Sequence, residues 1–522
     1  MTTPCPHAAS VAPLLALLLG AALATTETRA AAPNQVVVYP APRECALNTD
    51  FAIRVRVPGG EWQAVPTYVV KVDAVIGTEH SPRNSSLASF DFAGAVEVAI
   101  TSARGAIQSA RVRPLSHGIV PRVAGDTLTF TLTQPRNLSI EVNGEIFQNL
   151  QLFTNPLEEN RPDPSDPRVI YFGPGVHDAG SRTTAAPAEA PQPETAERLP
   201  NPTYRAVPAG GVLRVPSHTT VYLAGGAVVR GRILCDGVED IRIVGRGMIE
   251  QSGRGSGIRI AHSRHVEVRD IFTPQCFTGG SEHVTISGVR CISYVGNGDG
   301  MNVISSSDVL IDGVFNRNSD DCITVYGSRG GFHGDARRIT VRNATLWADV
   351  AHPILVGTHG STPHPEVLEQ LRFTNLDILD HHEPQLDYQG CLALNAGDSN
   401  LIRDVLFEDV RVEDFRRGQL VNLRVFFNEK YCTSPGRGIE DVTFRRVTYT
   451  GAHAETSIVA GYEAARPIRN VVFEDLVING VAIADDMAKP RWYKTADLAR
   501  IFVGEHVAGL VFRRSTPLVA TR

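Results

Sequence analysis

A pattern of apolar residues at positions 1, 3, 6 and 8 recurs through the second half of the chain. Alternating apolar and polar residues predict a strand, and the gap between positions 3 and 6 predicts a bend that turns the later residues inward again. Copies begin at Ile241 (imperfect), Val266, Val284, Val309, Ile339, Leu371, Val405, Val442, Val471 and Leu510 (weak). From Val266 onward the starts lie 18 to 39 residues apart, so we expect the additional residues to form loops.

Repeats of this length bury their apolar face only by stacking on their neighbours. With short strands, few helix signals and abundant Gly and Asn, they predict a right-handed parallel β-helix. A β-propeller is the rival architecture, but each of its blades needs four strands and these repeats hold two or three. Leucine-rich repeats are excluded because the required leucine spacing is absent. We therefore expect an all-β protein with the parallel β-helix over residues 211–522.

The region before the repeats has a different character. Residues 31–165 contain short strand-like stretches such as FAIRVRV, YVVKVD and TLTFTL, separated by Gly, Pro and Asn. Such a pattern favours an antiparallel β-sandwich. Residues 166–210 are expected to form a first coil, beginning near Val169, that is interrupted by a Pro-rich linker or insertion.

The amino terminus resembles a targeting segment. Residues 11–24 form an apolar run that is short for a membrane span, and Ala22 and Ala24 supply small residues for cleavage. We predict a signal peptide over residues 1–30 and an exported protein, extracellular or periplasmic. A membrane anchor is the alternative interpretation. After cleavage, no membrane association is expected.

Composition limits the classes of partner. The chain has 522 residues, a formal net charge of −6 and 43% apolar residues, so no strong field attracts nucleic acid. Outside the predicted signal there are seven cysteines, an odd number, and no CxxC pair or His/Cys cluster indicates a metal site. We expect a monomer that needs no cofactor, with one or two disulfides permitted by the count.

Three aspartates carry the candidate chemistry. Asp299 lies in GNGDGMN, and Asp320 and Asp321 lie in NSDDCI, 21 residues later. That interval is close to the repeat, so winding would stack the carboxylates on neighbouring turns about 4.8 Å apart. Repulsion would then keep one protonated near neutral pH, as a general acid beside a base requires. The alternatives are capping of local backbone amides and a structural Ca²⁺ site.

These motifs resemble the active-site signature of the polygalacturonase-like β-helix hydrolases, glycoside hydrolase family 28. The chain is also similar to the dextranase and isopullulanase group, family 49, through its amino-terminal sandwich. The resemblance implies hydrolysis of O-glycosidic bonds with inversion, in a polygalacturonan or pectin-like polymer or in an α-glucan of dextran or pullulan type. It implies that Asp320 is the general acid, and that Asp299 and Asp321 hold and activate the attacking water.

Departures from the family pattern define further candidates. The N-T-D motif of the family is NGD in this chain, so Asn297 is retained. The G-D-D motif is SDD. The G-H-G motif is absent from the next coil, and the R-I-K motif that binds a uronate carboxylate in the family is missing. These differences weaken the prediction of a galacturonan substrate more than the prediction of a hydrolase. The predicted substrate-binding residues are Asn297, Tyr326, His352, His359, Arg424 and Lys430. A polysaccharide lyase and a non-catalytic carbohydrate-binding β-helix remain as rival functions.

Overall fold

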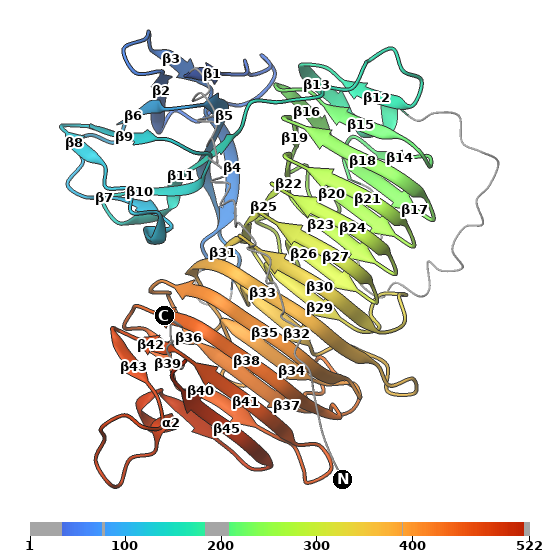
Figure 1. Ribbon diagram of the computed structural model, residues 1–522. Coiled ribbons are helices and arrows are strands. Elements are labelled where there is room, and N and C mark those ends of the chain that lie inside the picture. Colours follow the sequence, from blue (N-terminus) through green and yellow to red (C-terminus); the bar gives the residue numbers. More distant parts are fainter. Residues whose placement is uncertain (1–33, 76–78, 183–207, 389, 516–522) are drawn as a thin grey trace, which may run out of the picture.

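The computed structural model describes residues 34–75, 79–182, 208–388 and 390–515. An amino-terminal β-sandwich lies against one side of a long solenoid of parallel strands (Figure 1). The predicted fold class, a β-sandwich followed by a parallel β-helix, is confirmed. The predicted signal peptide, residues 1–30, lies outside the described residues.

The sandwich consists of two sheets, and strands such as β2 alternate between buried and exposed residues. One sheet contains β1 (Gln35–Val37), β5 (Pro82–Ala93), β11 (Glu145–Asn155), β10 (Asn137–Val142) and β7 (Ala110–Arg113), with β4 (Tyr68–Asp73) beside β5. The other contains β3 (Gln63–Val65), β2 (Phe51–Arg56), β6 (Val96–Ser102), β9 (Thr127–Leu132) and β8 (Arg122–Ala124). The antiparallel prediction is wrong for one pair, because β5 and β11 run parallel. A short 3₁₀ helix, η1 (Leu115–His117), follows β7.

The ten predicted repeats form one continuous face of the solenoid. Position 1 of every copy pairs with position 1 of the next, from Ile241 to Leu510. Two further strands extend this face at its start. The strands are β12 (Val169–Phe172), β15 (Thr220–Leu223), β18 (Glu239–Gly245), β21 (Arg264–Arg269), β24 (Glu282–Ser287), β27 (Ser307–Asp312), β30 (Ala336–Arg342), β33 (Val367–Asp380), β35 (Leu401–Val412), β38 (Gly438–Tyr449), β41 (Ile468–Glu474) and β45 (Val507–Arg513).

The predicted bend has a specific backbone cause. Position 5 of the repeat adopts a positive φ, for example 61° at Asp270, 55° at Asn343 and 55° at Asp409. The residue before position 1 does the same, as at His283 with 54°. Asn, Asp and Gly tolerate this left-handed region best, which explains their frequency here. Each such residue changes the side-chain phase, so positions 1, 3, 6 and 8 all face the interior.

The remaining strands complete each turn. The strands that follow the bend are β13 (Gly175–Asp178), β16 (Ala227–Arg230), β19 (Met248–Ile249), β22 (Phe272–Thr273), β25 (Arg290–Ile292), β28 (Phe315–Asn318), β31 (Thr345–Ala348) and β42 (Leu476–Ile478). Strand β43 (Val481–Ile483) pairs antiparallel with β42. The third strands form a separate sheet: β14 (Val212–Arg214), β17 (Arg232–Asp236), β20 (Gly257–Ala261), β23 (Cys276–Gly279), β26 (Met301–Ile304), β29 (Ile323–Tyr326), β32 (Ile354–Gly357), β34 (Leu392–Ala396), β37 (Val421–Val425), β40 (Ser457–Ala460) and β44 (Ile501–Val503). Smaller elements are η2 (Ala179–Arg182), β36 (Gly418–Gln419), β39 (Ala454–Glu455) and α2 (Thr495–Leu498).

The solenoid interior is a continuous apolar core. Aromatic rings from five successive turns stack at 4.7–5.0 Å between centroids, in the order Phe373, Phe407, Phe444, Phe473 and Phe512. Fully buried thiols also fill this interior, at Cys235, Cys276, Cys291, Cys322 and Cys391. All seven cysteines of the described ranges are free thiols, so the permitted disulfides do not form there.

The sandwich docks on the solenoid through apolar and charged contacts. Val72 and Phe153 of the sandwich share a buried cluster with Ile292, Phe315 and Trp347 of the solenoid. Buried ion pairs cross the same boundary, between Arg113 and Glu413 at 2.7 Å and between Asp91 and Arg246 at 2.7 Å. The sandwich is therefore a fixed part of the structure near the turns that carry the aspartates.

Candidate active site

The three aspartates lie at the same edge of the third solenoid sheet. Asp299 comes just before β26, and Asp320 and Asp321 come just before β29. These strands pair in parallel, with Met301 opposite Ile323. The amide of Gly300 donates to the carbonyl of Asp321 at 2.9 Å, so the two loops run side by side. The stacking of acidic residues on neighbouring turns is therefore present.

Glycines on both sides of Asp299 permit this close approach. A Cβ built on Gly300 would lie under 3.0 Å from the side chains of Asn316 and Asn318, and one on Gly298 would meet Ser319 equally closely. Any side chain at these positions would push the Asp299 loop away from the following turn. The glycines of GNGDG thus have a packing role.

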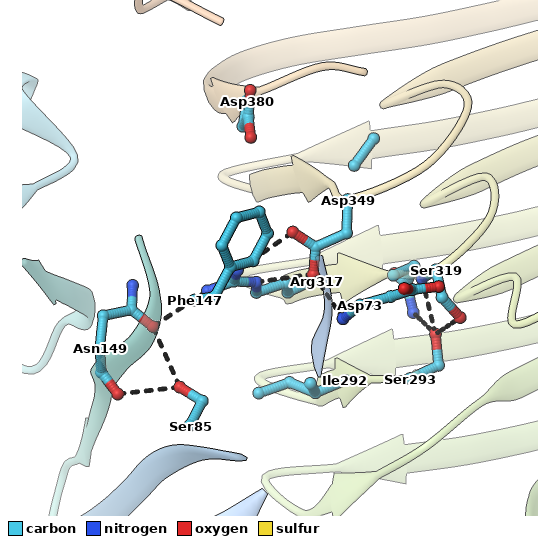
Figure 2. Close-up of polar contacts among 12 residues, drawn as sticks. Asp73, Ser85, Phe147, Asn149, Ile292, Ser293, Arg317, Ser319, Asp349 and Asp380 are labelled. Carbon is cyan, nitrogen blue, oxygen red and sulfur yellow. Dashed lines mark hydrogen bonds and ion pairs between the residues drawn. The ribbon is translucent and has the colours of Figure 1, made fainter. Parts of the chain in front are cut away.

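Two serines connect the aspartate loops. The hydroxyl of Ser293 donates to the carbonyl of Gly298. It also accepts from the amide of Ser319 at 3.1 Å (Figure 2). Ser319 in turn donates its hydroxyl to the carbonyl of Val295 at 2.5 Å. The serine that replaces the usual glycine before the aspartate pair therefore ties the Asp320 loop to the Asp299 loop.

The electrostatics of the cluster single out Asp320. Burial, followed by the charges of Asp299 and Asp321, raises the pKa of Asp320 well above its ordinary value. Its carboxylate accepts a local hydrogen bond from the amide of Asp321 at 3.0 Å. Burial and Asp321 also raise the pKa of Asp299, although Arg329 and a 2.8 Å bond from Asn302 act in the opposite direction. Asp320 is thus suited to hold a proton.

The carboxylate of Asp321, unlike that of Asp320, accepts hydrogen bonds from several neighbouring groups. Its carboxylate accepts from the Tyr326 hydroxyl at 3.0 Å, and from the backbone amide and Nδ1 of His352 at 3.1 and 2.7 Å. Nε2 of His352 faces the carbonyl of Tyr388 at 2.5 Å, so both ring nitrogens face acceptors. Burial acts to lower the pKa of His352, but the charge of Asp321, the hydrogen bond to it, the charge of Glu383 and the Tyr388 carbonyl together raise that pKa. The bonds from Tyr326 and His352 therefore fix the orientation of the Asp321 carboxylate.

Two residues that were predicted to bind substrate lie inside the protein and not at its surface. Tyr326 and His352 are fully buried, with 0% of each residue exposed. Because they are covered by protein, they contact Asp321 and not a bound sugar. Their place in the sequence, just after the aspartate pair and one turn further on, did not distinguish between these roles.

The other predicted substrate-binding residues lie at the surface of the same side. Asn297 is exposed, and His359 is half-buried with its ring centroid 5.1 Å from that of Tyr326. Burial, then the charge of Arg329, lowers the pKa of His359 well below its ordinary value, so its ring is neutral.

Arg424 and Lys430 lie further along the sheet, where Arg424 belongs to β37. Arg424 donates to the carbonyl of Asp387 at 3.2 Å, and Lys430 donates to Gln385 at 3.2 Å. Both cations therefore have protein partners on the turns that follow the aspartates.

A cleft opens beside Asp299 on the amino-terminal side of the cluster. Its lining includes Arg232, Arg259, Gln275, Phe277, Asn297 and Asn302. Of these residues, only Asn297 was predicted from the sequence. Arg329, whose guanidinium carbon lies 4.9 Å from the centroid of the Tyr326 ring, was not predicted either. For Asn302, alternation along the strand after Asp299 places the side chain on the outer face, and this was the one sequence signal that could have identified a lining residue.

The described residues contain neither a candidate metal site nor a candidate membrane-spanning helix. No group of three His, Cys, Asp or Glu side chains there is arranged to hold a metal ion. Within the same ranges, no helix has the length and apolarity needed to cross a bilayer.

Comparisons with known proteins agree with this geometry. Residues 279–491, which include all three aspartates, match the family described as Glycosyl hydrolases family 28. The chain is 25% identical over 193 residues to Probable endopolygalacturonase B from Aspergillus niger, covering 35% of this chain and 48% of that protein. It is 26% identical over 181 residues to Endopolygalacturonase B from Emericella nidulans, covering 33% and 45%. The match thus spans about half the length of these relatives.

A solved structure extends the likeness to nearly the whole chain. Dex49A from Penicillium minioluteum aligns with a TM-score of 0.52 at 12% identity, covering 91% of this chain and 96% of that chain. This likeness concerns the fold. Together with the family match, it identifies the chain as a polygalacturonase-like parallel β-helix protein.

Proposed function

We propose that this polygalacturonase-like chain is a glycoside hydrolase that cleaves O-glycosidic bonds with inversion of the anomeric centre. The observation that carries the proposal is the cluster of three carboxylates on two adjacent turns, in which the pKa of Asp320 is raised well above its ordinary value. One protonated and one ionised carboxyl group are what this hydrolysis requires. The match of residues 279–491 to the family 28 description supports the same reaction.

Asp320 acts as the general acid in this proposal. It donates its proton to the glycosidic oxygen as the bond from that oxygen to the anomeric carbon breaks. A water molecule attacks the anomeric carbon from the opposite face and gives its proton to a carboxylate. Direct attack by water requires an acid–base separation of roughly 6.5–9.5 Å and produces inversion.

Asp321 and Asp299 hold and activate that water. The Tyr326 hydroxyl and Nδ1 of His352 contact the Asp321 carboxylate and fix its orientation. Asn302 donates to Asp299 at 2.8 Å and orients this second carboxylate. Both groups are therefore held in place before substrate binds, which is the condition for efficient acid–base catalysis.

The substrate is a polysaccharide or oligosaccharide, either polygalacturonan or an α-glucan. Two relatives, 25% identical over 193 aligned residues and 26% over 181, are endopolygalacturonases by name, which favours the first. The missing R-I-K motif and the sandwich-plus-solenoid fold shared with Dex49A favour the second. The predicted signal peptide supports export of the enzyme to its polymeric substrate.

A panel assay tests the proposal. Purified protein is incubated with dextran, pullulan, polygalacturonate and arabinan, and new reducing ends are measured beside ultraviolet absorbance. We expect new reducing ends without absorbance from one of these glycans, and their loss in Asp320→Asn. Absorbance from an unsaturated sugar would indicate a lyase, and binding without cleavage of any glycan would indicate a carbohydrate-binding protein. Either result contradicts the hydrolase proposal.

A further inference from the structure

A strand of the sandwich reaches the loop that carries Asp299. Strand β4 ends at Asp73, and its Lys71 lies with Nζ 5.1 Å from the ring of Tyr294 at the start of that loop. Gln251 of the solenoid joins the two parts, since its amide nitrogen donates to the carbonyls of Lys71 at 3.0 Å and Ile292 at 2.8 Å. The amino-terminal domain therefore lies directly beside the candidate active site.

The carboxylate of Asp73 fixes the imidazole of His80. Asp73 is fully buried, and its Oδ2 is paired with Nδ1 of His80. Its other oxygen accepts from the amides of Ser81 at 2.9 Å and Val75 at 3.1 Å. The carboxylate thus sets both the ring orientation and the local backbone. The side chain of His80 is 45% exposed, so the pair sits at the surface.

The ring of His80 lies against the Asp299 loop. A Cβ built on Gly296 would be 3.0 Å from Nε2 of His80 and 3.4 Å from its Cδ2. Gly296 precedes Asp299 by three residues, in the same glycine-rich loop. The imidazole therefore occupies the space that a side chain at 296 would need, and it limits the outward movement of this backbone.

Asp73 also contacts the support of the second aspartate loop. Its amide donates to Oδ2 of Asp349 at 3.4 Å. Asp349 forms a two-bond ion pair with Arg317 at 2.9 and 3.0 Å, and both side chains are fully buried (Figure 2). Arg317 lies three residues before Asp320. One sandwich residue is thus linked to the loops of both Asp299 and Asp320.

We propose that Asp73 and His80 are positioning residues, supplied by the sandwich, that hold the two aspartate loops in their relative placement. Displacement of a catalytic group by about 1 Å costs roughly 10²-fold in rate, so such a clamp affects turnover without touching the substrate. The catalytic part of this inference rests on the proposed hydrolase function. The structural part does not, because it concerns the order of the loop itself.

Hydrogen exchange of the purified full chain tests the structural part without any substrate. His80→Ala is the informative variant because the exposed ring can be removed without opening a core cavity. The matched control is Asn137→Ala, which removes a different sandwich–solenoid contact, to Gly313 at 3.1 Å and from Arg290 at 3.0 Å. We expect faster amide exchange in a peptide covering residues 293–300 for His80→Ala only. Equal exchange in wild type and His80→Ala overturns the proposal.

Turnover tests the catalytic part, using Gly296→Ala as a second perturbation of the same contact. We expect kcat to fall about 10- to 100-fold in His80→Ala with KM within about twofold, because positioning is lost and binding is kept. Gly296→Ala should lower kcat by pushing the ring, and the double variant should be no slower than His80→Ala alone. If the losses of kcat in the two single variants multiply in the double variant, the two residues act independently and the proposed contact between His80 and Gly296 is contradicted. If wild type cleaves no glycan, the hydrolase proposal fails while the exchange result still decides the positioning role.

Discussion

Replacement of Asp320 by Asn separates the role of general acid from that of the two other carboxylates. The amide has nearly the same volume, so it removes the proton donor without leaving a cavity. Loss of general-acid catalysis costs about 10²- to 10⁴-fold in rate, which is roughly 2.7 to 5.4 kcal/mol at 1.36 kcal/mol for each tenfold change. We expect kcat on the natural glycan to fall by at least the lower of these factors.

The choice of substrate makes this prediction specific. A glycosyl fluoride has a leaving group that departs with little help from an acid, whereas the sugar oxygen of a glycan needs a proton. Asp320→Asn should therefore keep most of its activity on the fluoride. Asp321→Asn should lose activity on both substrates, because attack by water still needs a base. Initial rates of fluoride release and of reducing-end formation measure the two reactions.

Thermal unfolding provides a readout that does not depend on turnover. Because the folded pKa of Asp320 is raised, its contribution to stability is present at low pH and is lost as pH rises through that raised pKa. The amide stays neutral, so the melting temperature of Asp320→Asn should exceed that of wild type above this range. Equal losses on the glycan and the fluoride, with no gain in stability at higher pH, would refute the assignment of Asp320.

Three further predictions follow from the same contacts. Asp321→Asn removes a charge that raises the pKa of Asp320, so the alkaline limb of its residual pH–rate profile should move to lower pH, and an unmoved limb contradicts this coupling. Gly300→Ala should cost about 1–3 kcal/mol in the free energy of unfolding and lower kcat, because its Cβ would overlap Asn316 and Asn318, whereas Gly173→Ala, with one neighbour at 3.3 Å, should change neither. Arg317→Met leaves Asp349 buried without its main partner and should cost about 3–5 kcal/mol. Burial already raises the pKa of Asp349, so this loss should grow as pH rises through that raised pKa in denaturant titrations, and a loss independent of pH would show that Asp349 is not the cause.

The solenoid face was predictable because its signal is local and repeated. Each copy needs inward residues at fixed positions and a residue tolerant of positive φ at the bend, so the start at Val266 and the start at Leu371 obey the same rule. Stacking then places every copy in register. The spacing of the aspartates became informative only through this winding, since 21 residues correspond to about one turn there.

The strands of the sandwich were harder to predict from the pattern of apolar and polar residues. Strand β5 contains buried polar residues, including Ser85, Ser86 and Asp91, so it lacks the alternation that marks a half-buried strand. Its parallel pairing with β11 joins residues more than 60 positions apart, and no turn signal specifies such a partner. Local pattern therefore identified the class of this domain but not its longest strands.

The candidate site shows the same division between local and long-range information. The positions of Asp299 and Asp320 relative to their strands followed from the repeat. The contribution of His80 did not, because it depends on how one domain docks on the other. The burial of Tyr326 and His352 was not predictable either. A polar residue near a site gives the same sequence pattern whether its side chain faces a sugar or supports a carboxylate.

The configuration of the first sugar released tests the central claim most directly. Wild-type protein is mixed with the glycan that it cleaves, and proton NMR follows the new anomeric signal before mutarotation mixes the two forms. Single displacement by water predicts a first product of configuration opposite to that of the broken linkage, and no such product from Asp320→Asn. A first product that keeps the configuration of the linkage would contradict single displacement and the proposed roles of Asp299 and Asp321 in activating water.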